Sequence, residues 1–213
     1  MDLLVGPENG RIYLTHFQGI YPDGCLYYAQ AVLIHKRKPE LSGGSAAVSV
    51  LCDWNGDGAL DLVVGDASGD ISLFKNIGTP NQPRFSLPVK LSVGSNPIRI
   101  QAGATGSIQV PAEAKCGYIC PTVADWNNDG LPDLILSDVT GRHTLFLNVG
   151  ARTNPQLEEG KFILISGQPL QPVWRVRSRA IDWDGDGAVE YLTLSDKCIL
   201  TLYKRVPEEG KLL

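Results

Sequence analysis

A nine-residue pattern of oxygen-bearing residues occurs three times in this chain of 213 residues. In each copy the first residue is Asp, the third is Asp or Asn, the fifth is Asp, the sixth is Gly and the ninth is Asp or Glu. The three copies, called here the acidic loops, are residues 53–61, 125–133 and 182–190. A hard cation such as Ca²⁺ takes about 6–8 oxygen ligands from a tightly turned backbone, and glycine permits the bend. The pattern therefore predicts cation sites, although a single copy would also suit an ordinary turn without metal.

The residues after each loop distinguish it from an EF-hand, which carries a Glu at position twelve and lies between helices. Here the ninth residue is the carboxylate, and it begins a short apolar run such as Asp61-Leu62-Val63-Val64. Short apolar runs bounded by Gly and Asp are typical of strands. Each loop is therefore predicted to join one strand to the next.

A longer repeat surrounds the loops. Related stretches begin at Asp2, Asp61, Asp133 and Glu190, and such a recurring unit is typical of propellers, solenoids or arrays. Four short strands are predicted in each period. The first strands are 47–51, 119–123 and 175–181, the second follow the loops, the third are 71–75, 143–147 and 199–204, and the fourth are 85–91 and 162–166. Four antiparallel strands form one propeller blade.

We therefore predict an all-β fold, a β-propeller fragment of about three and a half four-stranded blades. It forms a single region, 1–213, with repeats that start near residues 1 (partial), 47, 119 and 175. The stretch at Asp2 lacks a loop and a first strand, so we expect an N-terminally truncated piece of a longer propeller. A closed four-blade ring is the alternative. Residues 92–118 are expected to form an extended loop or extra hairpin, or else a disordered surface insertion.

These motifs resemble the FG-GAP/VCBS repeat over nearly the whole chain. The resemblance lies in the loop pattern, a Gly-Asp-x-x-Gly turn, Leu-Phe-x-Asn-x-Gly and Pro-x-Phe. That family builds calcium-binding propeller blades in integrin α-subunit heads, some lectins and certain polysaccharide lyases. The literal Phe-Gly and Gly-Ala-Pro signatures of the integrin type are absent, which favours the bacterial VCBS branch.

The resemblance implies up to three Ca²⁺ ions, held by side chains at positions 1, 3, 5 and 9 and by the backbone carbonyl at position 7. The implied ligands are Asp53, Asn55, Asp57, Ala59 and Asp61; Asp125, Asn127, Asp129, Leu131 and Asp133; and Asp182, Asp184, Asp186, Ala188 and Glu190. Glu190 is one methylene longer than the expected Asp, so we expect a looser third site.

Candidate ligand-binding residues precede the third loop. Arg175, Arg177 and Arg179 alternate and would share one face of a strand, which in a propeller lines the central channel. They suit an anionic glycan, or else ion pairs with neighbouring Asp and Glu. Trp174 lies outside the loop register and is the better aromatic candidate for a ligand face.

Other aromatic and histidine residues are assigned to packing. Trp54, Trp126 and Trp183 all occupy the second loop position, and we expect them to pack between blades rather than stack on sugar. His143 stands where Ile71 stands in the preceding repeat, so it is predicted to face the core or an interface.

Composition excludes several classes. The net charge of −4 gives no basic footprint for nucleic-acid binding. No apolar stretch approaches the roughly 18 residues of a membrane span, and no signal peptide is visible. The five cysteines are accompanied by no second Cys/His pair for zinc. Weak calcium modules function outside the cell, so we expect an extracellular or periplasmic protein.

We therefore predict a calcium-stabilised binding or scaffold module that recognises a glycan or protein through one face. The remainder of a longer propeller, or self-association, is the expected assembly partner. The alternative is part of a carbohydrate-active enzyme such as a polysaccharide lyase. No catalytic residue is assigned.

Overall fold

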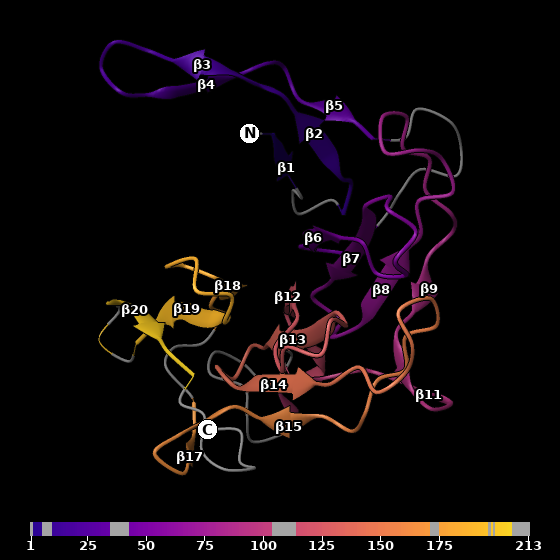
Figure 1. The fold of residues 1–213 in the computed structure, drawn as a ribbon, viewed down its shortest axis with the longest axis vertical. Helices are drawn as coiled ribbons and strands as arrows, with labels where there is room; N and C mark the ends of the chain where they lie inside the picture. Colours follow the sequence, from indigo (N-terminus) through magenta and orange to yellow (C-terminus); the bar gives the residue numbers. More distant parts are fainter. Residues whose placement is uncertain are drawn as a thin grey trace.

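The computed structural model describes residues 2–5, 10–34, 43–103, 114–170, 175–195, 197 and 199–205. All the elements whose bounds lie within these residues are β-strands, so the all-β prediction is confirmed. Four antiparallel sheets follow one another around an open, propeller-like arc (Figure 1). Within the described ranges, no helix is both long and apolar enough to cross a membrane.

The second and third sheets are the predicted four-stranded blades. The second contains β6 (Val48–Cys52), β7 (Asp61–Gly65), β8 (Ile71–Phe74) and β9 (Val89–Lys90), in that order. The third contains β12 (Cys120–Ala124), β13 (Asp133–Ser137), β14 (His143–Phe146) and β15 (Lys161–Phe162). Each acidic loop joins the first two strands of its sheet, so the ninth loop residue begins the second strand.

The first and fourth sheets have three described strands each. The first contains β1 (Leu3–Val5), β2 (Tyr13–Thr15) and β5 (Val32–Leu33). The fourth contains β18 (Arg179–Ile181), β19 (Glu190–Leu194) and β20 (Leu200–Tyr203). These two sheets lie at the two ends of the arc, so the described residues do not form the closed four-blade ring (Figure 1).

Three two-stranded hairpins lie beside the sheets. They are β3 (Phe17–Ile20) with β4 (Leu26–Tyr28), β10 (Ser92–Val93) with β11 (Asn96–Pro97), and β16 (Leu164–Ile165) with β17 (Gln168–Pro169). The predicted fourth strands, 85–91 and 162–166, are therefore wrong in length. In the second sheet the fourth strand is only Val89–Lys90, and Phe85 makes an isolated bridge with Asn76. In the third sheet it is only Lys161–Phe162, and positive φ angles at Ser166 and Gly167 turn the chain back soon after it. The extra hairpin predicted within 92–118 is confirmed at its start, and residues 104–113 lie outside the described part of the chain.

The strand predicted over 175–181 is also shorter than expected. Its regular part begins at Arg179. Arg175 has a φ of 58°, a left-handed conformation that interrupts an extended strand. Only the last three residues of the predicted strand therefore pair with β19.

The apolar core lies between the sheets. Ile12 of the first sheet packs against Leu62 and Phe74 of the second. The other two clusters join the second sheet to the third and the third to the fourth. Strands β7 and β13 are buried over their whole lengths, because each has a neighbouring sheet on both faces. This arrangement explains their continuous apolar sequences.

Candidate metal loops

The first acidic loop is folded around its own side chains. The carboxylate of Asp53 accepts hydrogen bonds from the backbone N–H groups of Asp57 (3.1 Å) and Gly58 (3.2 Å). The carboxylate of Asp57 accepts from the N–H of Ala59 and from the amide of Asn55, both at 2.8 Å. The oxygen-bearing side chains at positions 1, 3 and 5 therefore bond within the turn.

The second loop has the same geometry. Asp125 accepts from the N–H groups of Asp129 (3.0 Å) and Gly130 (2.8 Å). Asp129 accepts from Leu131 N–H and from the amide of Asn127, again at 2.8 Å. Since two different sheets give one arrangement, the loop sequence itself specifies it.

The carboxylate at position 9 bridges the loop and the turn that follows the third strand. Asp61 is fully buried, and its two oxygens accept from the N–H groups of Trp54 (3.2 Å) and Asn76 (2.7 Å). Asp133 makes the same two bonds at 2.8 and 2.7 Å. Burial raises the pKa of both carboxyls, although these hydrogen bonds oppose the rise. A cation beside the buried group would favour its ionised form.

An asparagine extends each bridge, and sequence reasoning assigned it no role. The side-chain oxygen of Asn76 accepts from the N–H groups of Gly78 (2.9 Å) and Arg84 (3.0 Å). Asn148 makes the equivalent bonds at 3.1 and 2.9 Å. The repeated Asn-x-Gly sequence could have indicated this role. In both copies the Asn side chain accepts hydrogen bonds from the backbone of the turn that follows.

The third loop differs because a lysine lies against it. Ligand oxygens of Asp182, Asp184 and Glu190 lie within 4.8 Å of one another, and no other group of three His, Cys, Asp or Glu residues in the described ranges does so. The ammonium of Lys204 pairs with Asp184 and lies 3.8 Å from Glu190 Oε1. The hydrogen bond from Lys204 lowers the pKa of Asp184, and the same contact raises the pKa of Lys204.

Arg152 lies against the first loop. Its Nη2 is 3.1 Å from Asp53 Oδ2, although it comes from the turn after β14 in the next sheet. A Cβ at Gly56 would lie 2.5 Å from the Arg152 side chain, so glycine leaves room for this approach. For the second loop, the described residues include no basic side chain within ion-pair distance of its carboxylates.

The donor sets fit Ca²⁺ unequally. All the loop side chains that converge are oxygen donors, which is the chemistry that Ca²⁺ requires. Each carboxylate oxygen that accepts one N–H hydrogen bond retains a second lone pair, which is available to a cation. The ligand oxygens converge most closely in the third loop, but Lys204 supplies positive charge there and Arg152 supplies it at the first loop.

The three candidate arginines are only partly brought together. The guanidinium of Arg175 lies over the ring of Tyr118, 4.0 Å from its centroid. Arg177 and Arg179 are exposed, and both lie near enough to Cys120 to oppose electrostatically the rise that burial causes in its pKa. Trp174 lies outside the described residues.

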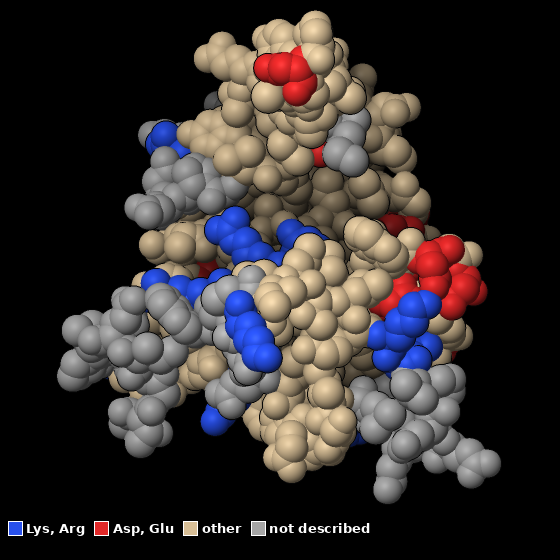
Figure 2. Space-filling view, turned by 90° about the vertical axis from the view of Figure 1, so that its left-hand side faces the viewer, with Lys and Arg blue, Asp and Glu red and all other residues tan. Residues whose placement is uncertain are grey.

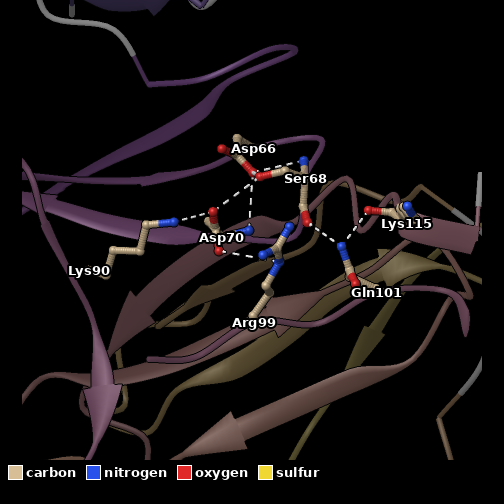
Figure 3. A network of polar contacts seen from close by, with 7 residues as sticks. All are labelled: Asp66, Ser68, Asp70, Lys90, Arg99, Gln101 and Lys115. Carbon is tan, nitrogen blue, oxygen red and sulfur yellow. Dashed lines mark hydrogen bonds and ion pairs between the residues drawn. The ribbon is translucent and has the colours of Figure 1, made fainter. Parts of the chain in front are cut away.

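A polar network closes the opposite end of the second sheet (Figure 3). Its members are Asp66, Ser68, Asp70, Lys90, Arg99, Gln101 and Lys115. Asp70 pairs with both Lys90 and Arg99, the latter at 3.7 Å. The amide of Gln101 donates to the backbone carbonyls of Ser68 (3.1 Å) and Lys115 (2.6 Å). These contacts tie the β7–β8 turn to the segment that leads into the third sheet.

His143 is a buried interface residue, as predicted, and does not resemble an accessible base. Its side chain is fully buried, and its Nδ1 lies 2.6 Å from the hydroxyl of Tyr191 in the fourth sheet. Burial lowers the pKa of His143 to about 4 and raises that of Tyr191. The pair therefore holds two sheets together in neutral form.

Comparisons with known proteins place part of this chain in a family. No curated protein matches the sequence. The matching solved structures include a mutant form of the Photorhabdus luminescens Tc holotoxin pore, with 20% identity and a TM-score of 0.45. That match covers 90% of this chain and 8% of the toxin chain, so the present chain spans a small part of its length. The family model described as FG-GAP-like repeat matches residues 125–193, from the second acidic loop through most of β19. The chain therefore contains an FG-GAP-like repeat at residues 125–193.

Proposed function

We propose that this chain is a calcium-stabilised, propeller-type binding or scaffold module. One observation carries the proposal: two acidic loops in successive sheets hold their oxygen donors in the same hydrogen-bonded arrangement. Each loop ends at a buried carboxylate bonded to the turn after the third strand. An ion in the loop would therefore join two strand ends and the following turn of one blade. The compartment that suits such weak calcium sites is extracellular or periplasmic.

The second loop is proposed as the principal calcium site. In the first loop the guanidinium of Arg152 already neutralises part of Asp53, and in the third Lys204 pairs with two expected ligands. A cation entering either of those loops must displace or coexist with a fixed positive charge. The second loop imposes no such competition from the described residues.

The test is thermal unfolding with millimolar Ca²⁺, with Mg²⁺ and with excess chelator. Calcium at ten times its Kd should stabilise the fold by about 1.4 kcal/mol per occupied site. For a chain of this size, that corresponds to a rise in Tm of roughly 3–6 °C. Asp129→Ala should remove most of the rise, whereas Glu158→Ala, outside the loops, should retain it. Equal melting temperatures in calcium and chelator would refute the calcium part of the proposal.

For the binding face, we propose Arg177 and Arg179 as contacts to an anionic ligand. Both are exposed beside the inner strand of the fourth sheet, and neither has an acidic partner among the described residues. Binding of heparin and polygalacturonate, with neutral dextran as the reference, tests this assignment by calorimetry. Arg177→Gln and Arg179→Gln should each weaken anion binding, whereas Arg84→Gln, an exposed arginine on another turn, should not. Equal binding of dextran would count against it.

A further inference from the structure

The tryptophans at the second loop position differ sharply in exposure. Trp54 and Trp126 are each 3% exposed, whereas Trp183 is 62% exposed. Trp54 belongs to the cluster between the second and third sheets. The ring of Trp126 meets that of Tyr191 in the fourth sheet edge to face, with centroids 5.9 Å apart. In each buried case, the following sheet covers the indole.

The third strand shows the same contrast. Leu200 pairs with the last residue of β19, as Ile71 pairs with the last residue of β7 and His143 with the last of β13. Ile71 and His143 are fully buried, but Leu200 is 64% exposed. We call Ile181, Trp183 and Leu200 the trailing face of the fourth sheet. It has the sequence of a covered interface and, in the described residues, no sheet on it.

The first sheet presents the complementary half. Since Asp2 aligns with Asp61, Leu3 and Val5 correspond to Leu62 and Val64. Leu62 and Val64 are buried against the preceding sheet, but Leu3 and Val5 are 41% and 42% exposed. We call Leu3 and Val5 the leading face.

The β3–β4 hairpin extends from this sheet as an apolar arm. It leaves the end of β2, and the equivalent turn after β14 sends Arg152 across to the loop of the preceding sheet. The arm exposes Ile20 (62%), Tyr21 (54%) and Leu26 (53%). Figure 1 shows it reaching away from β1, β2 and β5. By position, it would cross onto a sheet that precedes the first.

We propose that the trailing face of one molecule packs on the leading face and arm of a second copy of this chain, head to tail. The occupant is argued from the chain itself, which already makes this type of contact three times between its own sheets. No apolar cluster of described residues joins the two end faces within one molecule. Figure 2 shows one side of the molecule, where residues other than Lys, Arg, Asp and Glu make up most of the surface and several Lys and Arg side chains lie near its middle. The exposed apolar side chains of the two end faces suit burial against another sheet.

A head-to-tail contact has a distinctive signature. Because the two surfaces differ, a pair of copies retains one unused leading face and one unused trailing face, so association closes into a ring or continues as a chain. Changing either face in every molecule should abolish association. Mixing one variant of each kind should restore a single contact, which a two-fold symmetric contact through one face would not do.

Light scattering after size-exclusion chromatography, over micromolar to submillimolar protein in calcium, tests the proposal. The native chain should give twice the mass of the single chain or more, rising with concentration. Trp183→Ser, Leu200→Ser and the double variant Leu3→Ser/Val5→Ser should each give the single mass, with unchanged circular dichroism. An equimolar mixture of Leu200→Ser with Leu3→Ser/Val5→Ser should give a dimer.

The matched control is Leu87→Ser, since Leu87 is 68% exposed but belongs to neither face. It should associate like the native chain. A native chain of single mass at every concentration would overturn the proposal. So would association that survives all three face variants, or a mixture that remains at the single mass.

Discussion

The carboxylate at the ninth loop position is bonded to backbone groups on two sides before any ion is considered. Asp133 is fully buried and accepts from Trp126 and Asn148 N–H groups. Removing a buried acceptor leaves its donors without partners and costs their desolvation. At the scale of single residues, this position therefore has a structural role distinct from metal binding.

We expect Asp133→Ala to lower the free energy of unfolding by about 2–6 kcal/mol, since two buried N–H groups lose their acceptor at about 1–3 kcal/mol each. Urea unfolding in chelator measures the change without metal. Asp129→Ala is the control, because Asp129 lies in the same loop but is exposed. A loss for Asp133→Ala that appears only in calcium would show that the carboxylate acts through the ion alone.

His143 should make the protein sensitive to mild acid. Its pKa is about 4 when folded, below its ordinary value of 6.5, because the ring is buried. The unfolded chain therefore binds more protons between these pH values, and stability falls as pH decreases through this window. The expected loss between pH 7 and pH 5 is about 2 kcal/mol.

Urea unfolding at pH 7 and pH 5 checks this expectation. The variant is His143→Ile, because Ile71 occupies the same register position in the second sheet. Its loss between the two pH values should be smaller than that of the native chain by about 2 kcal/mol. Tyr191→Phe removes the hydroxyl partner but keeps the imidazole, so it should remain acid-sensitive. Equal pH dependence in the native chain and His143→Ile would assign the effect to other groups.

At the scale of elements, the sequence predicted those parts whose form is locally determined. The acidic loops and the strands that follow them were predictable because Asp, Asn and Gly bond within the turn and the apolar run starts at the ninth residue. The burial of Trp54 and Trp126 followed from the repeat, but the same prediction is wrong for Trp183. Its exposure depends on whether another sheet is present, which local sequence does not state.

The remaining elements depend on distant contacts. Arg152 meets Asp53 across 99 residues of sequence, and no spacing rule indicates that pair. The fourth strands are two residues long, and a short hairpin follows each of them, β10–β11 after the first and β16–β17 after the second. Apolar content alone does not distinguish a long strand from a short strand followed by a hairpin.

The three loops should differ in metal affinity, and Lys204 gives the clearest test. Lys204→Met removes a positive charge from Asp184 and Glu190. Calcium affinity of the third loop should rise roughly thirtyfold, the order expected when a divalent ion no longer repels a unit positive charge about 4 Å away in water. Terbium luminescence excited through the loop tryptophans measures it, with calcium as competitor.

Two controls separate this local effect from a general change in the net charge of the protein. Lys161→Met removes an exposed lysine paired with Glu158, far from the acidic loops in sequence, and should leave the titration unchanged. Asp186→Ala within Lys204→Met should remove the gain if the new affinity belongs to the third loop. A titration identical to that of the native chain would show that Lys204 does not compete with the ion.

At the scale of the whole molecule, each sheet contacts only its neighbours along the arc. Stability in such an array is approximately a sum of the stabilities of the units and of the interfaces between them. The second and third sheets have two interfaces, and the end sheets have one among the described residues. The burial of the strands follows the number of interfaces of their sheet. Strands β7 and β13 of the middle sheets are wholly buried, whereas β1 of an end sheet is largely exposed.

Hydrogen exchange should therefore be slowest in β7 and β13, faster in β19 and fastest in β1, because local opening is easiest where fewest contacts are lost. Mass spectrometry of exchanged peptides at low protein concentration measures this order in the isolated molecule. At high concentration, β1 and β20 should gain protection together if the end faces meet, while β7 and β13 should change little. In Leu200→Ser both gains should disappear, although only one of the two faces is altered, because a head-to-tail contact needs both. Protection gained by β20 alone would instead indicate a contact of that strand with itself.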